Sequence, residues 1–118
     1  MVVEMRTRAL GSVGKYYVYR LRYPNNRAVF GVKAGTVFYV GKGKGSRSDE
    51  HRAETKSLIR RKAWREMKHK HKVIMDIWQA GHEVIEELVG RSDDEEVALQ
   101  AEAFQIAMQG IENLTNEK

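Results

Sequence analysis

The sequence predicts a small α+β domain, in which a three-stranded, mainly antiparallel sheet is flanked by helices. Two segments near the N-terminus are rich in β-branched and aromatic residues, as strands are. Beyond Asp49 the apolar residues recur at the 3.6-residue spacing of helices. A chain of 118 residues has room for one core and no second one. We therefore expect one domain over residues 15–118, after an N-terminal arm of residues 1–14.

Three segments have the pattern of strands. The stretch KYYVYRLRY, residues 15–23, is followed by Pro24 and two asparagines, which indicate a turn. TVFYVG, residues 36–41, is expected to pair with it as an antiparallel hairpin, and RAVFGV in the connecting loop can add a short strand. EVIEELVG, residues 83–90, is the third strand. The predicted order is strand, strand, helix, strand, helix.

Two helices are expected. Over residues 55–80 the apolar side chains share one side, and the other side carries a basic stripe of Arg61, Lys62, Arg65, Lys68 and Lys72. His69 and His71 point about 200° apart on a helix and cannot share a metal ion, so both are assigned to solvent. Trp64, Trp78 and Phe104 are assigned to the core or its edge. The last helix should begin at a capping box, SDDE at 92–95, and end at Gln109 before Gly110.

Charge and composition narrow the function. Residues 1–41 hold seven Lys or Arg and one acid, residues 42–75 hold twelve and four, and residues 76–118 hold two and eleven. The basic part favours a polyanion such as nucleic acid, or it is a solvated face without a ligand. There is no cysteine for a disulfide or a thiolate zinc site, and no apolar run of membrane-spanning length. An intracellular protein with no membrane partner is expected.

Two local patterns suggest a site. Gly41, Gly43 and Gly45 alternate with Lys42 and Lys44, which would let the backbone approach a phosphate, although such a stretch is also an ordinary turn. The spacing is not that of a P-loop. Glu102 shares one side of the last helix with Leu99 and Ile106. A carboxylate there needs a partner or a cation, unless it lies at the boundary and reaches water.

These motifs carry a family resemblance. YVY at Tyr17–Tyr19 and YVG at Tyr39–Gly41 resemble the paired motifs of the GIY-YIG nuclease superfamily, although Tyr17 stands where that family most often has glycine. The motifs GKGKGSR…H and G…NLTN are most similar to those of the subgroup that includes the animal nucleases with LEM and ankyrin domains. The resemblance implies a set of residues at the scissile phosphate: Tyr19, Tyr39, Lys42, Arg47, His51, the metal-binding Glu102 and Asn116.

The resemblance implies an endonuclease that hydrolyses DNA with Mg²⁺, for which Mn²⁺ may substitute, and without a small-molecule cofactor. Arg47 would clamp a phosphate oxygen. Tyr19 or Tyr39 would act as the base with Lys42 or His51 as its basic neighbour, and Tyr19 assisted by His51 is the preferred pair. Lys44 and the basic stripe would contact the DNA backbone, which predicts structure-selective or weakly sequence-specific cleavage. Two alternatives remain: a non-catalytic DNA- or RNA-binding module on the same scaffold, and a basic protein-interaction domain, which leaves the glycine-lysine stretch unexplained.

Overall fold

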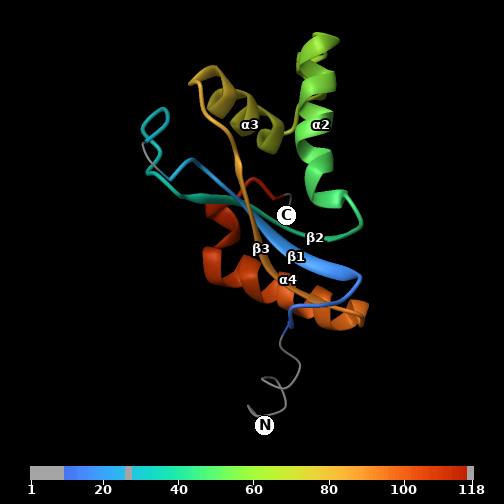
Figure 1. The fold of residues 1–118 in the computed structure, drawn as a ribbon. Coiled ribbons are helices and arrows are strands. Elements are labelled where there is room, and N and C mark those ends of the chain that lie inside the picture. Colours follow the sequence, from blue (N-terminus) through green and yellow to red (C-terminus); the bar gives the residue numbers. More distant parts are fainter. Residues whose placement is uncertain (1–9, 26–27, 117–118) are drawn as a thin grey trace.

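The computed structural model describes residues 10–25 and 28–116 and confirms the α+β fold (Figure 1). Short 3₁₀ turns, η1 and η2, follow α2 and α4. The elements in chain order are β1 (Tyr16–Arg22), β2 (Val37–Lys44), α2 (Arg47–Arg60), η1 (Trp64–Glu66), α3 (His69–Gln79), β3 (Ile85–Ser92), α4 (Glu95–Gln109) and η2 (Ile111–Asn113).

The three strands form one antiparallel sheet in the order β2-β1-β3, so β1 is central. The outer edge of β2 pairs with no further strand, and we call it the open edge, although Thr115 N bonds there to Phe38 O (2.7 Å). The hairpin of β1 and β2 and the third strand are as predicted. The glycine-lysine stretch is not the loop we expected, because β2 continues through it to Lys44 and the turn begins only at Gly45 (φ +64°). The possible short strand in the connecting loop is a single bridge between Val29 and Val32.

Each face of the sheet packs against different helices, as Figure 1 shows. Tyr17, Tyr19 and Leu21 of β1 belong to one core cluster with Val73, Ile74 and Ile77 of α3. Val18 faces the other way and packs with Val40 and with Ala98 of α4. The period-2 alternation of β1 thus supplies both cores.

The single helix expected over residues 55–80 is wrong, because the chain turns sharply after α2. Lys62 adopts a left-handed conformation (φ +56°), and its N–H bonds to Ile59 O (3.0 Å) while that of Ala63 bonds to Leu58 O (2.9 Å). These two bonds form the Schellman motif that ends helices. Lysine is an unusual residue at this position, where glycine is common, and the sequence therefore gave no signal for the break.

The break changes the surroundings of the two histidines. His69 is exposed as expected, but the assignment of His71 to solvent is wrong. His71 is buried, its Nδ1 accepts a hydrogen bond from Lys68 N (3.0 Å), and its Nε2 lies 3.3 Å from Glu54 Oε1. It closes the first turn of α3, a helix that the sequence did not predict as a separate element.

The last helix is close to its predicted bounds. It ends at Gln109 with Gly110 at φ +82°, as expected, but its N-cap is Asp94, whose carboxylate accepts from Glu96 N (2.9 Å), and not Ser92. The assignment of Trp64 and Phe104 to the core is also wrong, since they are 50% and 59% exposed. Trp78 does pack at the edge of the core.

Residues 1–9 of the predicted arm lie outside the described residues. In its described part, Gly11 pairs with Arg91 through two backbone hydrogen bonds of 2.8 Å, and Leu10 packs on the α4 side of the sheet. The boundary at residue 14 stays a prediction. Within the described chain no helix is both long and apolar enough to span a membrane.

Candidate functional site

Three aromatic side chains from three elements meet at the centre of the candidate site. Tyr19 of β1 shares a hydrogen bond of 2.5 Å between its hydroxyl and Nε2 of His51, which is the fifth residue of α2. Tyr39 of β2 is in edge contact with His51, with ring centroids 4.7 Å apart. Tyr19 and His51 are 2% and 0% exposed, whereas Tyr39 is only partly buried. Tyr39 therefore lies nearest the solvent.

The glycine of the YVG motif makes this contact possible. Gly41 stands opposite Tyr19 in the β1–β2 register, and a Cβ on Gly41 would lie 2.5 Å from the Tyr19 hydroxyl oxygen. The ring of Tyr19 thus occupies the space of the missing side chain. Tyr39 pairs with Leu21 and Val37 with Arg22, so Phe38 is an extra residue in β2, a bulge that re-aims the adjoining Tyr39.

Tyr17 holds the turn between β2 and α2, directly before Arg47. Its hydroxyl donates to Gly45 O (2.6 Å) and accepts from Ser48 N (3.1 Å). Gly43 stands opposite Tyr17, and a Cβ there would lie 2.7 Å from Cβ of Arg47. A large residue in place of the family's usual glycine is therefore used here to hold the start of α2. The guanidinium of Arg47 bonds to Glu50 (2.8 Å), which occupies one of its five donors.

The electrostatics of the site keep His51 neutral and Tyr19 protonated. Burial lowers the pKa of His51 to about 4, with further contributions from the positive charges of Lys70 and Arg47. Burial also raises the pKa of Tyr19 far above its usual value, and the neighbouring Tyr39 adds to the rise. The pKa of Tyr39 is raised by burial too, against the opposing charge of Arg47. The pair is therefore a neutral imidazole beside a neutral phenol at pH 7.

Sequence reasoning missed Lys70. Its Nζ lies 5.1 Å from the ring centroid of Tyr39, and the side chain is buried at the start of α3. Lys70 shares a stripe with Val73, Ile74 and Ile77, at the spacing of one helix face. A lysine on an apolar stripe was the available signal. The same signal was present in the single helix expected over residues 55–80, because Lys70 follows Met67 by three residues and precedes Ile74 by four, but it was not used.

Glu102 and Asn116 both lie along the open edge of β2. The side chain of Asn116 accepts from Val40 N (3.0 Å) and donates to Val40 O (2.7 Å), as a neighbouring strand would. Glu102 is half-buried, and burial raises its pKa, against the charge of Lys42 and a hydrogen bond from the Lys42 backbone. The charge of Glu102 also raises the pKa values of Tyr19 and Tyr39, so Glu102 is near enough to the aromatic cluster to interact with it electrostatically.

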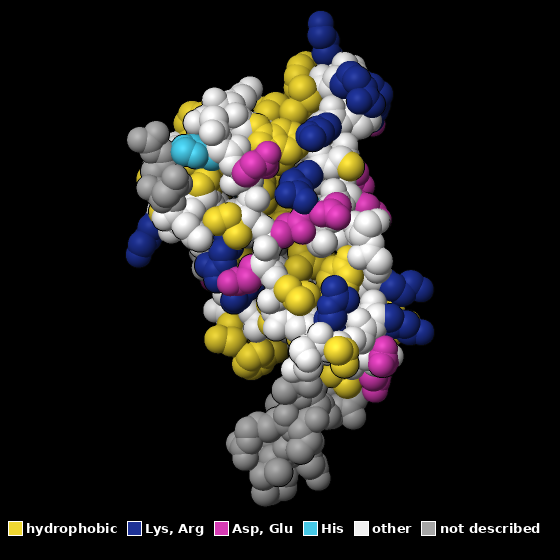
Figure 2. Space-filling view, in the orientation of Figure 1, with side chains coloured by type: hydrophobic (Ala, Val, Ile, Leu, Met, Phe, Trp, Pro, Cys, Tyr) yellow, Lys and Arg dark blue, Asp and Glu magenta, His cyan; other side chains and the backbone are white. Residues whose placement is uncertain are grey.

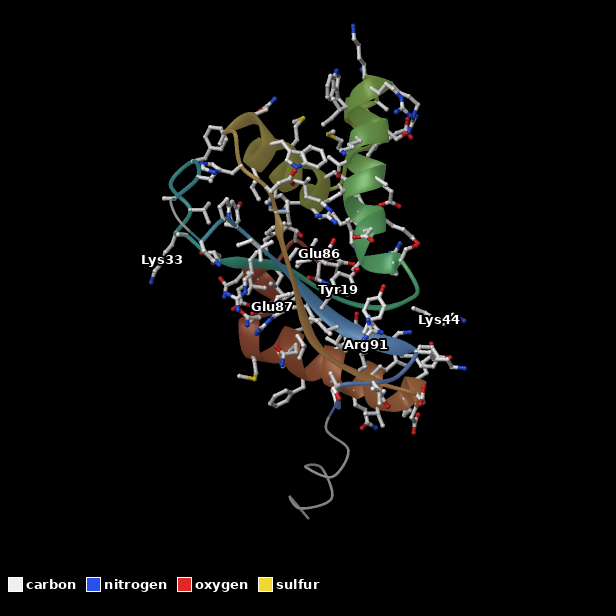
Figure 3. The ribbon with its side chains drawn as sticks, viewed as in Figure 1. Tyr19, Lys33, Lys44, Glu86, Glu87 and Arg91 are labelled. Atoms are coloured by element: carbon white, nitrogen blue, oxygen red, sulfur yellow. The ribbon has the colours of Figure 1, made fainter. Side chains whose placement is uncertain are left out.

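The two lysines of the glycine-lysine stretch point elsewhere. Lys42 pairs with Val18 and so faces α4, where its Nζ bonds to Glu95 (2.8 Å). Lys44 is exposed at the end of the sheet opposite to Lys33, as Figure 3 shows, and Tyr19 lies between them. Lys42 is thus close enough for its charge to lower the pKa of Glu102, and the contact of Lys44 with a substrate stays a prediction.

The predicted basic stripe is not one surface. Its five residues are exposed, but they are divided among the end of α2, η1 and α3. Only Lys68 acts on a tyrosine of the site, by lowering the pKa of Tyr39. Arg61 bonds to Ser57 (3.2 Å) and lies 3.7 Å from Glu66. Figure 2 shows Lys and Arg side chains gathered over the outer end of α2.

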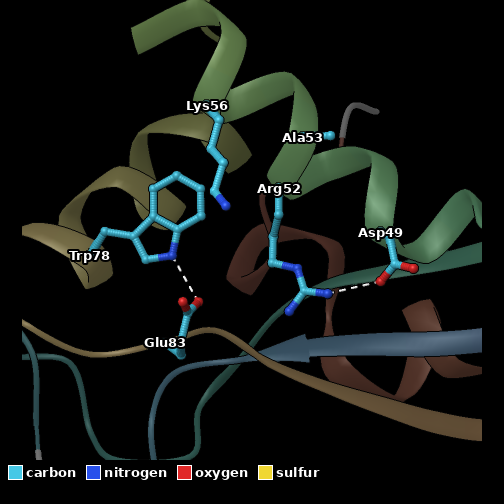
Figure 4. A pocket seen from close by; sticks show the side chains of 6 residues that line it. All are labelled: Asp49, Arg52, Ala53, Lys56, Trp78 and Glu83. Atoms are coloured by element: carbon cyan, nitrogen blue, oxygen red, sulfur yellow. Dashed lines mark hydrogen bonds and ion pairs between the residues drawn. The ribbon is translucent and has the colours of Figure 1, made fainter. Parts of the chain in front are cut away.

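A separate hollow of about 290 Å³ lies between α2, α3 and the start of β3 (Figure 4). Its polar groups are paired with one another: Trp78 Nε1 donates to Glu83 (2.8 Å), and Arg52 bonds to Asp49 (2.8 Å). Lys56 Nζ lies 5.9 Å from the Trp78 ring centroid. None of the predicted site residues lines this hollow.

Glu102 fits the requirements of a hard divalent cation. Mg²⁺ keeps most of its water and is bound by one or two carboxylates together with phosphate oxygens. Among the described residues no group of three or more His, Cys, Asp or Glu could enclose a metal ion. The single carboxylate at the edge of β2, partly withdrawn from water, suits an ion that the protein shares with its substrate.

The candidate site thus consists of two tyrosines on adjacent strands, an arginine and a histidine on the next helix, and a glutamate at the edge of β2. A family model described as the LEM-3-like GIY-YIG domain matches residues 23–118, and the chain belongs to this family, which is one of nucleases. The expected superfamily and subgroup are thereby confirmed. Neither the curated proteins nor the solved structures gave a match. The matched region begins after β1, so the position of Tyr19 comes from the structure.

Proposed function

We propose that the chain is a metal-dependent endonuclease that hydrolyses DNA phosphodiester bonds at the open edge of β2. The observation that carries this proposal is the hydrogen bond between Tyr19 and the buried, neutral His51, beside Arg47 and Glu102. The family supports nuclease chemistry in general. The site residues support its assignment to this edge, since they join a proton acceptor, a cation and a carboxylate.

Tyr19 acts as the base through His51. A phenol with a raised pKa is not ionised at pH 7, so it can accept a proton from water only while it passes its own proton on. In the tautomer with the proton on Nδ1 of His51, Nε2 receives that proton. The water oxygen then bonds to phosphorus, the bond to the departing oxygen breaks, and that oxygen takes a proton from solvent.

Substrate binding strengthens this relay. Lys70 and Arg47 lower the pKa of His51 in the free protein. A phosphodiester between them would offset their charge, so the pKa of His51 would rise when DNA is bound. His51 becomes a better proton acceptor only when substrate is present, which is the condition under which a base is needed.

The other residues bind and position. Arg47 has donors beyond the one used by Glu50 and can hold a non-bridging phosphate oxygen. Glu102 would hold Mg²⁺ or Mn²⁺, and such an ion, when bound, supplies positive charge at the transition state. Asn116 positions β2, with Tyr39 and Gly41 on either side of Val40. Lys44 and Lys68 are placed to contact phosphates near the site, and cleavage is expected to follow DNA shape more than sequence.

The test is nicking of a supercoiled plasmid in Mg²⁺ and in EDTA, with the parent protein and the Glu102→Gln variant. We expect nicking by the parent only with the metal, and a loss of about 1000-fold in Glu102→Gln, because several kcal/mol of charge stabilisation disappear. DNA affinity should change by a few-fold at most. Glu96→Gln, on the exposed first turn of the same helix, is the matched control and should retain the parent rate.

The outcomes separate this function from its alternatives. A parent protein that binds DNA and never nicks it would be a non-catalytic binding module. One that does neither would be consistent with a protein-interaction domain. If Glu102→Gln nicks at an appreciable fraction of the parent rate, Glu102 is not the metal ligand.

A further inference from the structure

The turn after α2 presents a tryptophan to solvent among cationic side chains. Trp64 is 50% exposed and is the first residue of η1. Arg61 and Lys62 precede it, Arg65 follows it, and all three are exposed. Figure 2 shows hydrophobic atoms beside the Lys and Arg side chains at this end of the molecule. An exposed aromatic ring between cations is the combination that proteins use to bind unpaired nucleotides.

The turn has a defined shape. The Schellman bonds fix its start, the N–H of Glu66 bonds to Ala63 O (3.0 Å), and Met67 is buried at its end. Arg61 and Glu66 lie 3.7 Å apart across it. Residues 62–66 line a hollow of about 310 Å³. A ring held on an ordered turn loses little entropy when a base stacks on it, which favours binding.

The other exposed aromatic and apolar side chains have different surroundings. Phe104, Met108 and Leu99 lie on α4, in the acidic last third of the chain, which disfavours a polyanion. Trp78 is partly buried and bonded to Glu83. Phe30 in the β1–β2 loop is 71% exposed, but its direct neighbours in sequence are Val29 and Gly31. Of these exposed aromatic side chains, Trp64 is the one with an exposed basic residue, Arg65, directly beside it in sequence.

We propose that residues 61–66 form a second DNA contact, in which Trp64 stacks on an unpaired base while Arg61, Lys62 and Arg65 bind the phosphates beside it. This inference rests on the proposed function, because it names the substrate class of the same protein: DNA with an unpaired segment near the cleaved bond. Every base offers a ring face, so the contact selects for DNA structure and not for sequence.

The position of the turn sets the distance between the second DNA contact and the cleaved phosphate. Arg47 begins α2 and the turn follows its end 14 residues later. At 1.5 Å per residue the two lie about 20 Å apart, which corresponds to about six nucleotides of a stacked strand. We therefore expect the unpaired segment about six nucleotides from the cleaved phosphate.

The test measures binding in EDTA, where cleavage does not interfere. The probes are a duplex with a single-stranded flap and a fully paired duplex of the same sequence. Trp64→Ala should weaken flap binding about 10-fold, the value of one stacked base, and duplex binding less than 2-fold. Trp64→Phe should restore most of the loss. Phe104→Ala, which removes an exposed aromatic side chain elsewhere, should leave both affinities unchanged.

A spectroscopic measurement keeps the test independent of folding defects. The chain has two tryptophans, so Trp78→Phe leaves Trp64 as the only one. We expect single-stranded DNA to quench its fluorescence and the paired duplex to leave it nearly unchanged. Absence of quenching, or an equal loss of affinity for both probes in Trp64→Ala, would overturn the inference. Plasmid nicking by the parent is scored separately, so failure of the second contact and failure of the nuclease function are distinguishable.

Discussion

At the scale of single residues, the state of His51 is set by neighbours from four elements. Tyr19 of β1 and Tyr39 of β2 contact its ring. Its pKa is shifted electrostatically by two residues of α2, Arg47 and Glu54, and by two of α3, Lys70 and His71. Burial and the cations favour the neutral ring, and only Glu54 favours the charged one. Its Nδ1 is buried without a hydrogen-bond partner among the described residues. The site therefore holds a neutral imidazole, with one ring nitrogen protonated and the other free to accept a proton.

Replacing Lys70 should change that state measurably. Lys70→Met keeps a side chain of similar length and removes the charge, so the pKa of His51 should rise from about 4. NMR titration of the His51 imidazole gives the value directly. Lys56→Met is the matched control, since it also removes a lysine placed over an aromatic ring, that of Trp78. A His51 pKa that stays at about 4 in Lys70→Met would mean that Lys70 does not contribute to it.

At the scale of elements, two glycines of β2 leave the space in which side chains of the site pack. Gly41 makes room for Tyr19, and Gly43 makes room for Arg47 and Tyr17. Two bulges adjoin this region, because Phe38 is extra in β2 and Val89 is extra in β3, between the partners of Val18 and Tyr19. Gly41 and Gly43 thus serve the packing of tyrosine rings, and the approach of a phosphate to the backbone stays a prediction.

Filling the space at Gly41 should separate Tyr19 from His51. The Cβ of Gly41→Ala would lie 2.5 Å from the tyrosine oxygen, so the buried ring must shift. We expect the nicking rate to fall by about 100-fold, as for a misplaced catalytic group, in a variant that still folds by circular dichroism. Gly11→Ala, whose Cβ meets nothing within 4 Å, should match the parent. An unchanged rate in Gly41→Ala would argue against Tyr19 as the base.

At the scale of the whole molecule, the charge asymmetry of the sequence is partly cancelled by folding. Acidic residues of the last third pair with basic residues of the first two thirds. These ion pairs are Lys42–Glu95 (2.8 Å), Arg22–Glu87 (2.9 Å), Arg52–Glu86 (2.9 Å) and Arg20–Glu87. The cations at the end of α2 lie outside these pairs. DNA is therefore expected to meet a more restricted basic surface than the sequence indicates.

Stability should fall in mild acid. The pKa of His51 is lowered from 6.5 in the unfolded chain to about 4 in the folded one, so the unfolded state binds the extra proton between these values. The stabilisation is complete above pH 6.5 and is lost as pH falls through about 4, by about 3 kcal/mol. Urea unfolding at pH 7 and pH 4.5 measures the change. His51→Gln should show a smaller acid loss than the parent, and an equal loss would assign the effect to other groups.

The sequence by itself determined the elements that depend on local pattern. Alternation and β-branched residues predicted the three strands, and Gly110 predicted the end of α4. The short motifs led to the family, because tyrosine-x-glycine, the arginine and histidine after it, and a late Glu and Asn occur in a fixed order. The intracellular location stays a prediction, since no feature of the structure bears on it.

Only the tertiary structure decided which residues share the site. A lysine at φ +56° broke the expected helix, and the resulting turn buried His71 and brought Lys70 over Tyr39. It also left Trp64 exposed. The open edge of β2 gathered Glu102 and Asn116 from distant parts of the chain. Backbone breaks, bulges and edge contacts depend on long-range packing, which overrides local propensity, and for that reason they could not be predicted from residue spacing.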